Sequence, residues 1–231
     1  MNKKEALSIY KDELKNICGD YEELVKFLAF CTNFNKKSYS SMNKAIIRHF
    51  YPQSLFVNTM KQWNLAGYSV KKGEEAMCLL APNFKKRKKV DKDGVETDET
   101  EDYLCGFSCF WVFDASQVKD KEGNPFIPEA YEFDPLFELD EELNDAIESL
   151  GGEIEYAEGY ENLNTLFNDN LSGAIAEYVL ASQLCIPTDK AVLNIKRHMD
   201  AKEYDVVKTA LREGQDLAKK MYERLEEKAF A

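Results

Sequence analysis

Residues 62–89, which read QWNLAGYSVKKGEEAMCLLAPNFKKRKK, change from a helical to an extended pattern at Gly67. Before this glycine we expect a short helix that holds Trp63, because glycine commonly follows the last turn of a helix. Beyond it the residues alternate as in strands, and the stretch ends in the basic run KKRKK at 85–89. The stretch therefore predicts a small unit that combines helix and sheet.

The strand pattern continues on both sides of an acidic segment. Tyr68 and Val70 alternate with polar residues, and an apolar run at 76–80 is expected to form a strand that closes at Pro82. The aromatic run YLCGFSCFWVF at 103–113 predicts a second strand. Between these runs, residues 83–102 carry few apolar side chains, so we expect a mobile hairpin loop there.

Helical spacing marks both ends of the chain. Residues 21–34 and 41–49 predict two helices that begin after Asp20 and the Ser40/Ser41 pair. After a proline-rich linker at 119–137, the expected helices cover residues 138–150, 171–184 and 201–228. The fold class is thus α+β, with N-terminal helices packed on a small antiparallel sheet and a mainly helical C-terminal region. We expect domains at 1–120 and 121–231.

Composition and apolar runs indicate the cellular location of the protein. The chain has 231 residues and a net charge of −12, and it lacks an apolar run long enough for a signal peptide or a membrane span. The expected location is therefore the cytoplasm, with no membrane partner. The six cysteines form no C-x-x-C motif, and we interpret them as reduced core residues.

Charge is distributed unevenly along the chain. Residues 1–90 carry a net charge of +9, and residues 91–231 carry −21. Within residues 36–90, twelve basic residues stand against two acidic ones and are interleaved with aromatic residues. A basic surface with stacking rings is typical of proteins that bind single-stranded nucleic acid. Two ordinary solvated faces of opposite charge are an alternative. Taken singly, Phe56 and Trp63 are better explained as core residues, whereas Tyr39, Tyr51 and Tyr68 fit the core and the surface equally.

Catalytic motifs are missing from the sequence. His49 and His198 are the two histidines, and no H-E-x-x-H helix, G-x-S-x-G elbow or phosphate-binding G-x-x-x-x-G-K-[ST] loop can be written. We therefore expect a protein that is not an enzyme and that needs no metal or cofactor.

Three ordered motifs resemble the N-terminal domain of ArdC-type antirestriction proteins over roughly residues 5–120. They are YSSMN at 39–43, WNLAGYSVKKGE at 63–74 and VFDASQ at 112–117. The resemblance implies a single-stranded DNA-binding module encoded by plasmids, phages or integrated elements. It assigns Asn43, Trp63, Gly67, Lys71, Lys72 and Gly73 to the signature of that module.

The C-terminal part departs from the family pattern. Longer members continue into a zinc-metallopeptidase-like domain with an H-E-x-x-H helix, which this sequence lacks. Residues 143–160 and 171–186 resemble the flanks of such a domain, and Glu177 could match its downstream acidic ligand. A single carboxylate does not hold zinc, so we interpret this part as a degenerate, non-catalytic remnant.

These observations lead to two hypotheses. The first is a non-catalytic single-stranded DNA-binding protein of a mobile element or phage, with an antirestriction or DNA-protecting role. Its expected nucleic-acid contacts are Tyr39, Asn43, Lys44, Arg48, Trp63, Lys71, Lys72, Lys85, Lys86, Arg87, Lys88 and Lys89. The alternative is an acidic protein-interaction module or DNA mimic that inhibits a host nuclease or another host defence protein.

Overall fold

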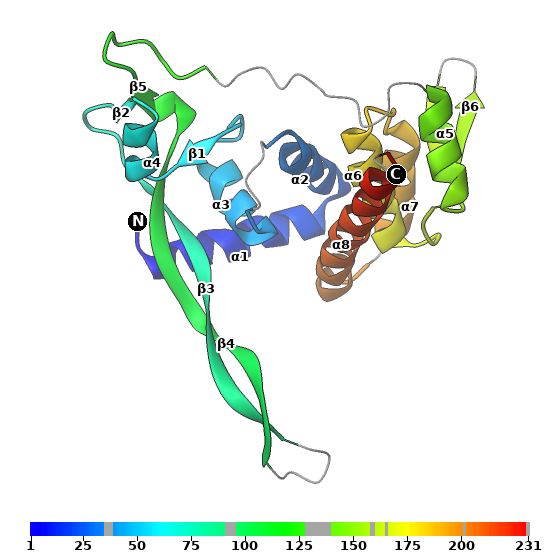
Figure 1. The fold of residues 1–231 in the computed structure, drawn as a ribbon, viewed down its shortest axis with the longest axis horizontal. Coiled ribbons are helices and arrows are strands. Elements are labelled where there is room, and N and C mark those ends of the chain that lie inside the picture. The colour runs from blue at the N-terminus through cyan, green and yellow to red at the C-terminus, as the bar shows by residue number, and fades with distance from the viewer. Residues whose placement is uncertain are drawn as a thin grey trace. The chain divides into compact units, whose positions relative to one another are not determined.

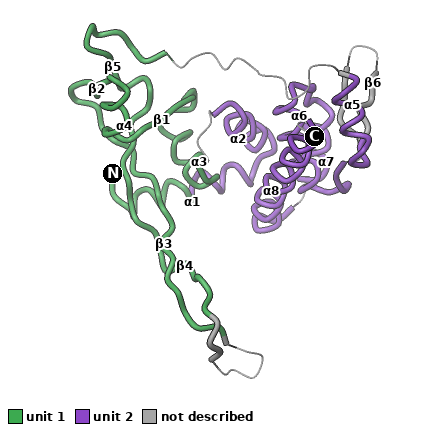
Figure 2. Tube along the Cα trace, viewed as in Figure 1, with its two compact units in different colours: residues 1–11, 37–128 green, residues 12–36, 129–231 purple. Residues whose placement is uncertain are grey.

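The computed structural model describes residues 1–34, 39–90, 96–127, 140–157, 160–164, 166–200 and 202–229. The chain divides into two compact units (Figure 2). Unit 1 comprises residues 1–11 and 37–128, and unit 2 comprises residues 12–36 and 129–231. Helix α1 (Lys3–Gly19) therefore contributes its beginning to unit 1 and its end to unit 2.

Unit 1 is built around a long antiparallel hairpin (Figure 1). Besides the start of α1, its elements are α3 (Ser41–Phe50), β1 (Val57–Asn58), α4 (Met60–Leu65), β2 (Ser69–Val70), β3 (Met77–Val90), β4 (Glu96–Asp114), the 3₁₀ helix η1 (Ala115–Gln117) and β5 (Val118–Lys119). The strand order β1-β4-β3 makes one small antiparallel sheet, and β2 pairs with β5 in a second. Helix α3 packs against β3.

Local sequence explains the boundaries of these elements. Ser40 caps α3 by accepting a hydrogen bond from the Asn43 N–H, and Thr59 forms a capping box with Gln62 at the start of α4. Gly67 follows α4 with a φ of 87°, a left-handed conformation that favours glycine. The expected helices at 41–49 and around Trp63 are confirmed.

The hairpin corrects the loop expected at 83–102. Strands β3 and β4 remain paired from Met77↔Val112 to Val90↔Glu96, so residues 83–90 and 96–102 are extended, and residues 91–95 lie outside the described part. Pro82 does not close β3 but sits within it, opposite Phe107. A proline is tolerated there because β3 is an edge strand of its sheet, where a missing N–H removes no necessary ladder bond.

Unit 2 is mainly helical. Besides the end of α1, its elements are α2 (Tyr21–Asn33), α5 (Asp140–Ser149), β6 (Glu153–Ala157), β7 (Tyr160–Asn164), α6 (Leu171–Gln183), α7 (Asp189–Met199) and α8 (Tyr204–Ala229). The expected helices at 21–34, 171–184 and 201–228 correspond to α2, α6 and α8, and α5 covers the described part of the expected helix 138–150. Asp20 accepts a hydrogen bond from the Glu23 N–H and caps α2 as expected.

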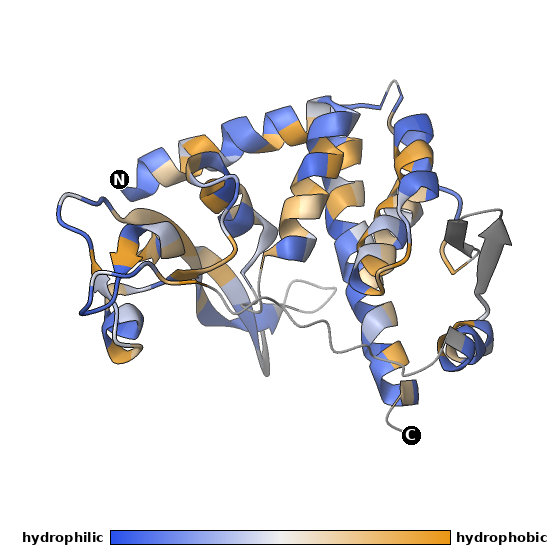
Figure 3. Ribbon diagram, turned by 90° about the horizontal axis from the view of Figure 1, so that it is seen from above, coloured by the Kyte–Doolittle hydropathy of each residue, from blue (hydrophilic) through white to orange (hydrophobic). Residues whose placement is uncertain are grey.

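Helices α6 and α8 form the centre of unit 2, where buried apolar residues of both helices pack together. Apolar and polar residues alternate along the helices of the structure (Figure 3). Gly214 on α8 permits their close approach, because a Cβ atom there would lie 2.6 Å from the Ser172 carbonyl oxygen and 2.7 Å from Ile175. The fold class expected from the sequence is thus confirmed, with a mainly helical C-terminal region. No described helix is long and apolar enough to cross a membrane.

The cysteines follow the core interpretation in part. Cys18, Cys31 and Cys78 are buried, and burial raises the pKa of the Cys78 thiol to about 12. Cys105 and Cys185 are exposed, so the expectation that all six lie in the core was wrong for these two. Cys105 stands at an irregularity of the hairpin, beside Gly106 with a φ of 145°, where the register shifts between Asn83 and Phe84.

Candidate nucleic-acid interface

Trp63 is the centre of a small aromatic core in unit 1. Its side chain is 0% exposed, and its Nε1 donates a hydrogen bond of 3.0 Å to the Phe113 carbonyl. The rings of Phe56, Tyr68 and Phe126 surround it at centroid distances of 5.0 to 6.0 Å. A ring held in this way has no face open to a base. Trp63 therefore organises the unit and is not placed to stack on DNA.

A buried polar network joins two of the sequence motifs. Asp114, only 4% exposed, accepts hydrogen bonds from the Ser54 hydroxyl and from the Ser116 N–H. Gln117 accepts from the Asp114 N–H at 2.9 Å and donates to Glu74 and to the Glu75 carbonyl, each at 2.9 Å. Two of these bonds lie within the turn after β4, and those to Ser54, Glu74 and the Glu75 carbonyl connect the turn to neighbouring loops, so the network fixes the backbone.

Lys71 and Asn43 are also used for structure. The Lys71 ammonium donates to the Ser116 carbonyl at 2.7 Å. The Asn43 side chain, which is buried, donates to the Leu80 carbonyl and accepts from the Leu80 N–H, both at 2.9 Å. These two bonds attach α3 to β3. The expectation that Asn43 and Trp63 contact DNA is therefore corrected, because burial removes both side chains from any ligand.

The remaining expected contacts differ in exposure. Tyr39, Lys44 and Arg48 are half-buried, and the Tyr39 ring stacks on Phe110 at a centroid distance of 6.5 Å. Lys72 and the run at 85–89 are exposed. The structure thus brings the signature residues together in a scaffold and leaves the basic run on the surface, where a polyanion can reach it.

The basic run lies on an extended part of the hairpin, residues 82–90 and 96–107, which we term the arm (Figure 1). Across the arm, Lys86 faces Asp102 and Arg87 faces Glu101. The Arg87 Nε lies 2.7 Å from Glu101 Oε1, and its guanidinium carbon lies 5.2 Å from the centre of the Tyr103 ring. The five basic residues at 85–89 therefore lie on the strand opposite segment 96–102, whose five acidic residues the sequence count ending at residue 90 did not include.

Exposed rings accompany the basic run. Phe84 is 60% exposed and faces Leu104, which is 50% exposed, while Trp111 on β4 is 53% exposed. Sequence reasoning missed these residues because it predicted 103–113 as a strand without assigning its two faces, and it placed Phe84 in a loop. The strand alternation could have separated them: Val112 is buried, so its neighbour Trp111 must point to the opposite face.

Part of unit 1 and part of unit 2 are similar to a known protein family. Residues 20–113 match the family model of the N-terminal domain of anti-restriction factor ArdC. This segment is therefore similar to the N-terminal domain of ArdC-type proteins. The resemblance based on the three motifs is thereby confirmed, and it relates the chain to antirestriction proteins.

Among solved structures, the chain is similar to the metal-free crystal structure of the antirestriction ArdC protein from the R388 plasmid. Identity is 15% and the TM-score is 0.49, with 94% of this chain and 97% of that chain covered. No curated protein matches the chain.

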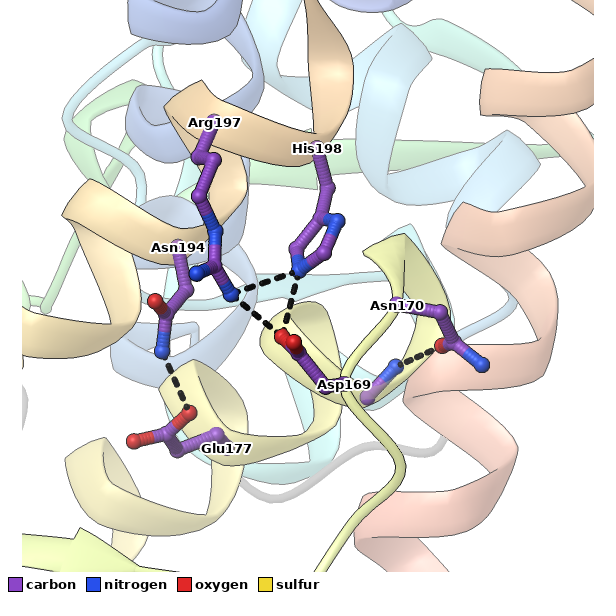
Figure 4. A network of polar contacts seen from close by, with 7 residues as sticks. Asp169, Asn170, Glu177, Asn194, Arg197 and His198 are labelled. Atoms are coloured by element: carbon purple, nitrogen blue, oxygen red, sulfur yellow. Dashed lines mark hydrogen bonds and ion pairs between the residues drawn. The ribbon is translucent and has the colours of Figure 1, made fainter.

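Unit 2 holds a second polar cluster, which lies C-terminal to the matched residues 20–113 (Figure 4). Asp169 accepts a hydrogen bond from Arg197 and lies 2.7 Å from His198 Nε2, while Asn170 caps α6 through the Gly173 N–H. The hydrogen bond with His198 is the main cause that lowers the pKa of Asp169. These contacts attach the loop before α6 to the last turn of α7.

A pocket of about 300 Å³ adjoins this cluster. Glu177 lines it and accepts a hydrogen bond of 3.4 Å from the Asn194 Nδ2. No group of three or more His, Cys, Asp or Glu side chains in the described residues could hold a metal ion. His49 belongs to unit 1 and His198 to unit 2. The residues beside Glu177 thus do not fit a zinc ligand set, because its nearest polar partner is an amide.

Burial raises the pKa of Glu177, against a smaller lowering by Asn194 and Lys190. Folding then favours the protonated carboxyl, so this group's contribution to stability decreases as the pH rises from the unfolded value through the higher folded value. We expect Glu177→Gln to raise the melting temperature at pH 7 by on the order of 1 to 3 °C and to change little at pH 4. Thermal melts at both pH values test this, and a lower melting temperature at pH 7 would contradict it.

Proposed function

We propose that this protein binds single-stranded DNA without catalysis, through the arm and through Lys44, Arg48 and Lys72 of unit 1. The observation that carries the proposal is the run of five consecutive exposed basic residues at 85–89, directly preceded by the exposed ring of Phe84. The ArdC-type domain gives it a family context, since the family resemblance implies single-stranded DNA binding.

Strand geometry favours an extended ligand. Successive side chains of β3 point to opposite faces, so Lys86 and Lys88 lie on one face of the arm and Lys85 and Arg87 on the other. Ammonium groups on both faces can follow a flexible phosphate backbone. The exposed Phe84 and Trp111 supply faces on which bases can stack without sequence preference.

The test is a salt titration with a fluorescent oligothymidylate. Lys85→Glu combined with Lys86→Glu is expected to weaken binding at least about tenfold at 0.1 M salt. The slope of the logarithm of the binding constant against the logarithm of the salt concentration should become less steep by about 1.4, since each single-strand phosphate contact contributes about 0.7. A matched control is Lys220→Glu with Lys228→Glu, which makes the same charge change at exposed positions of α8. Equal losses in both variants would indicate a net-charge effect and contradict the assignment to the arm.

In the cytoplasm of a host, a protein of this kind would coat entering single strands of a plasmid or phage and shield them from nucleases. The measurable form is protection of an oligonucleotide from a single-strand nuclease, lost in the Lys85/Lys86 variant. If the wild-type chain binds no single strand at low salt but inhibits a host nuclease, its acidic surface acts instead and the proposal fails.

A further inference from the structure

The arm carries opposite charges on its two strands, in register. Lys86 and Asp102 are direct neighbours, as are Arg87 and Glu101, the latter pair joined by an ion pair. Among the described residues, β1 pairs with β4 only at Phe113 and Asp114, so no third strand covers the arm. The arm thus presents one basic edge and one acidic edge.

The basic and acidic edges are close enough to interact with the same ligand. Neighbouring strands lie about 4.8 Å apart, whereas charges are screened over about 8 Å at physiological ionic strength. A phosphate held at the basic edge therefore experiences the acidic edge as well. The acidic strand weakens the attraction of the basic edge for any polyanion. The repulsive energy increases with the number of phosphates that cannot move away from the carboxylates.

We infer that the acidic strand of the arm, through Glu101 and Asp102, gives the protein its preference for single-stranded over double-stranded DNA. A single strand is flexible, so it can turn its phosphates toward the basic edge and recover affinity by stacking on Phe84. A duplex is stiff, keeps its bases stacked internally and carries a charge every ~1.7 Å of axis. It cannot meet the basic edge without also placing phosphates near the acidic one. This inference rests on the proposed function.

The experiment compares affinities for a single strand and for the corresponding duplex. Glu101→Gln with Asp102→Asn is expected to raise duplex affinity roughly fivefold more than single-strand affinity at 0.1 M salt. Asp216→Asn with Glu227→Gln on α8 removes two exposed carboxylates from unit 2 and should leave the ratio unchanged. The reverse change, Thr100→Glu beside Lys88, should increase the preference for the single strand.

The outcomes separate the inference from the proposed function. If the wild-type chain binds no single strand, both are overturned. If it binds single strands but Glu101→Gln/Asp102→Asn raises both affinities equally or leaves both unchanged, the inference alone is overturned. Circular dichroism of each variant checks that the arm still forms, since Glu101→Gln also removes the ion pair with Arg87.

Discussion

Trp63→Ala is expected to unfold unit 1, whereas Trp111→Ala should leave the fold intact and weaken DNA binding. Trp63 is fully buried among aromatic rings and donates to the Phe113 carbonyl. Its truncation leaves a large cavity and an unsatisfied carbonyl, at a cost of about 3 to 5 kcal/mol. Trp111 is 53% exposed, and loss of one stacked base would cost about 1 to 3 kcal/mol of binding, which is roughly 5- to 150-fold in affinity.

The two tryptophans of the chain serve as controls for each other. Urea unfolding followed by near-ultraviolet circular dichroism measures the stability change, and oligonucleotide titration measures binding. Trp111→Ala that retains full single-strand affinity would contradict the stacking role. Trp63→Ala that melts like the wild type would contradict the core assignment.

The motifs that this chain shares with the ArdC N-terminal domain are mostly structural. Trp63, Lys71, Asp114 and Gln117 make buried or backbone-directed contacts, which demand fixed residue types at fixed spacing. Sequence reasoning recognises such positions because their spacing is local. It cannot recognise from the same pattern which residues face solvent, and for that reason Trp63 was included among the expected nucleic-acid contacts and Trp111 was missed.

The charge distribution of the arm could not be predicted from the sequence, for a different reason. The basic run at 85–89 and the acidic run at 96–102 fall on opposite sides of residue 90, so a charge count that ends at this residue gave a strongly basic segment. Strand pairing brings the two runs side by side. Because polar strands of this kind bury almost nothing, hydrophobic periodicity gave no signal for them, and a loop was the natural expectation.

The elements that sequence analysis left out, α1, α7 and the β6–β7 hairpin, have weak or interrupted apolar patterns. In α7, three residues are buried, Ala191, Ile195 and Met199, within a helix of only 11 residues. Their helical spacing is regular but the segment is short, so tertiary contacts with α6 and α2 determine its state.

Asn43→Ala is expected to be among the most destabilising single changes in unit 1, although the side chain is small and polar. Asn43 satisfies both the N–H and the carbonyl of Leu80 within a buried environment. Alanine would leave both backbone groups without their partner, and each unsatisfied group costs about 1 to 3 kcal/mol. We therefore expect a loss of about 2 to 5 kcal/mol, measured by urea unfolding.

Asn43→Asp provides the informative comparison, because it keeps an oxygen that can accept from the Leu80 N–H but loses the donor to the Leu80 carbonyl. A carboxylate there would face that carbonyl in a buried site, so its pKa should rise and the variant should be more stable at pH 4 than at pH 7. If Asn43 instead served mainly as a DNA contact, Asn43→Ala would retain wild-type stability and lose affinity. Unfolding and binding measured on the same two variants thus decide between a structural and a ligand-contacting role for this residue.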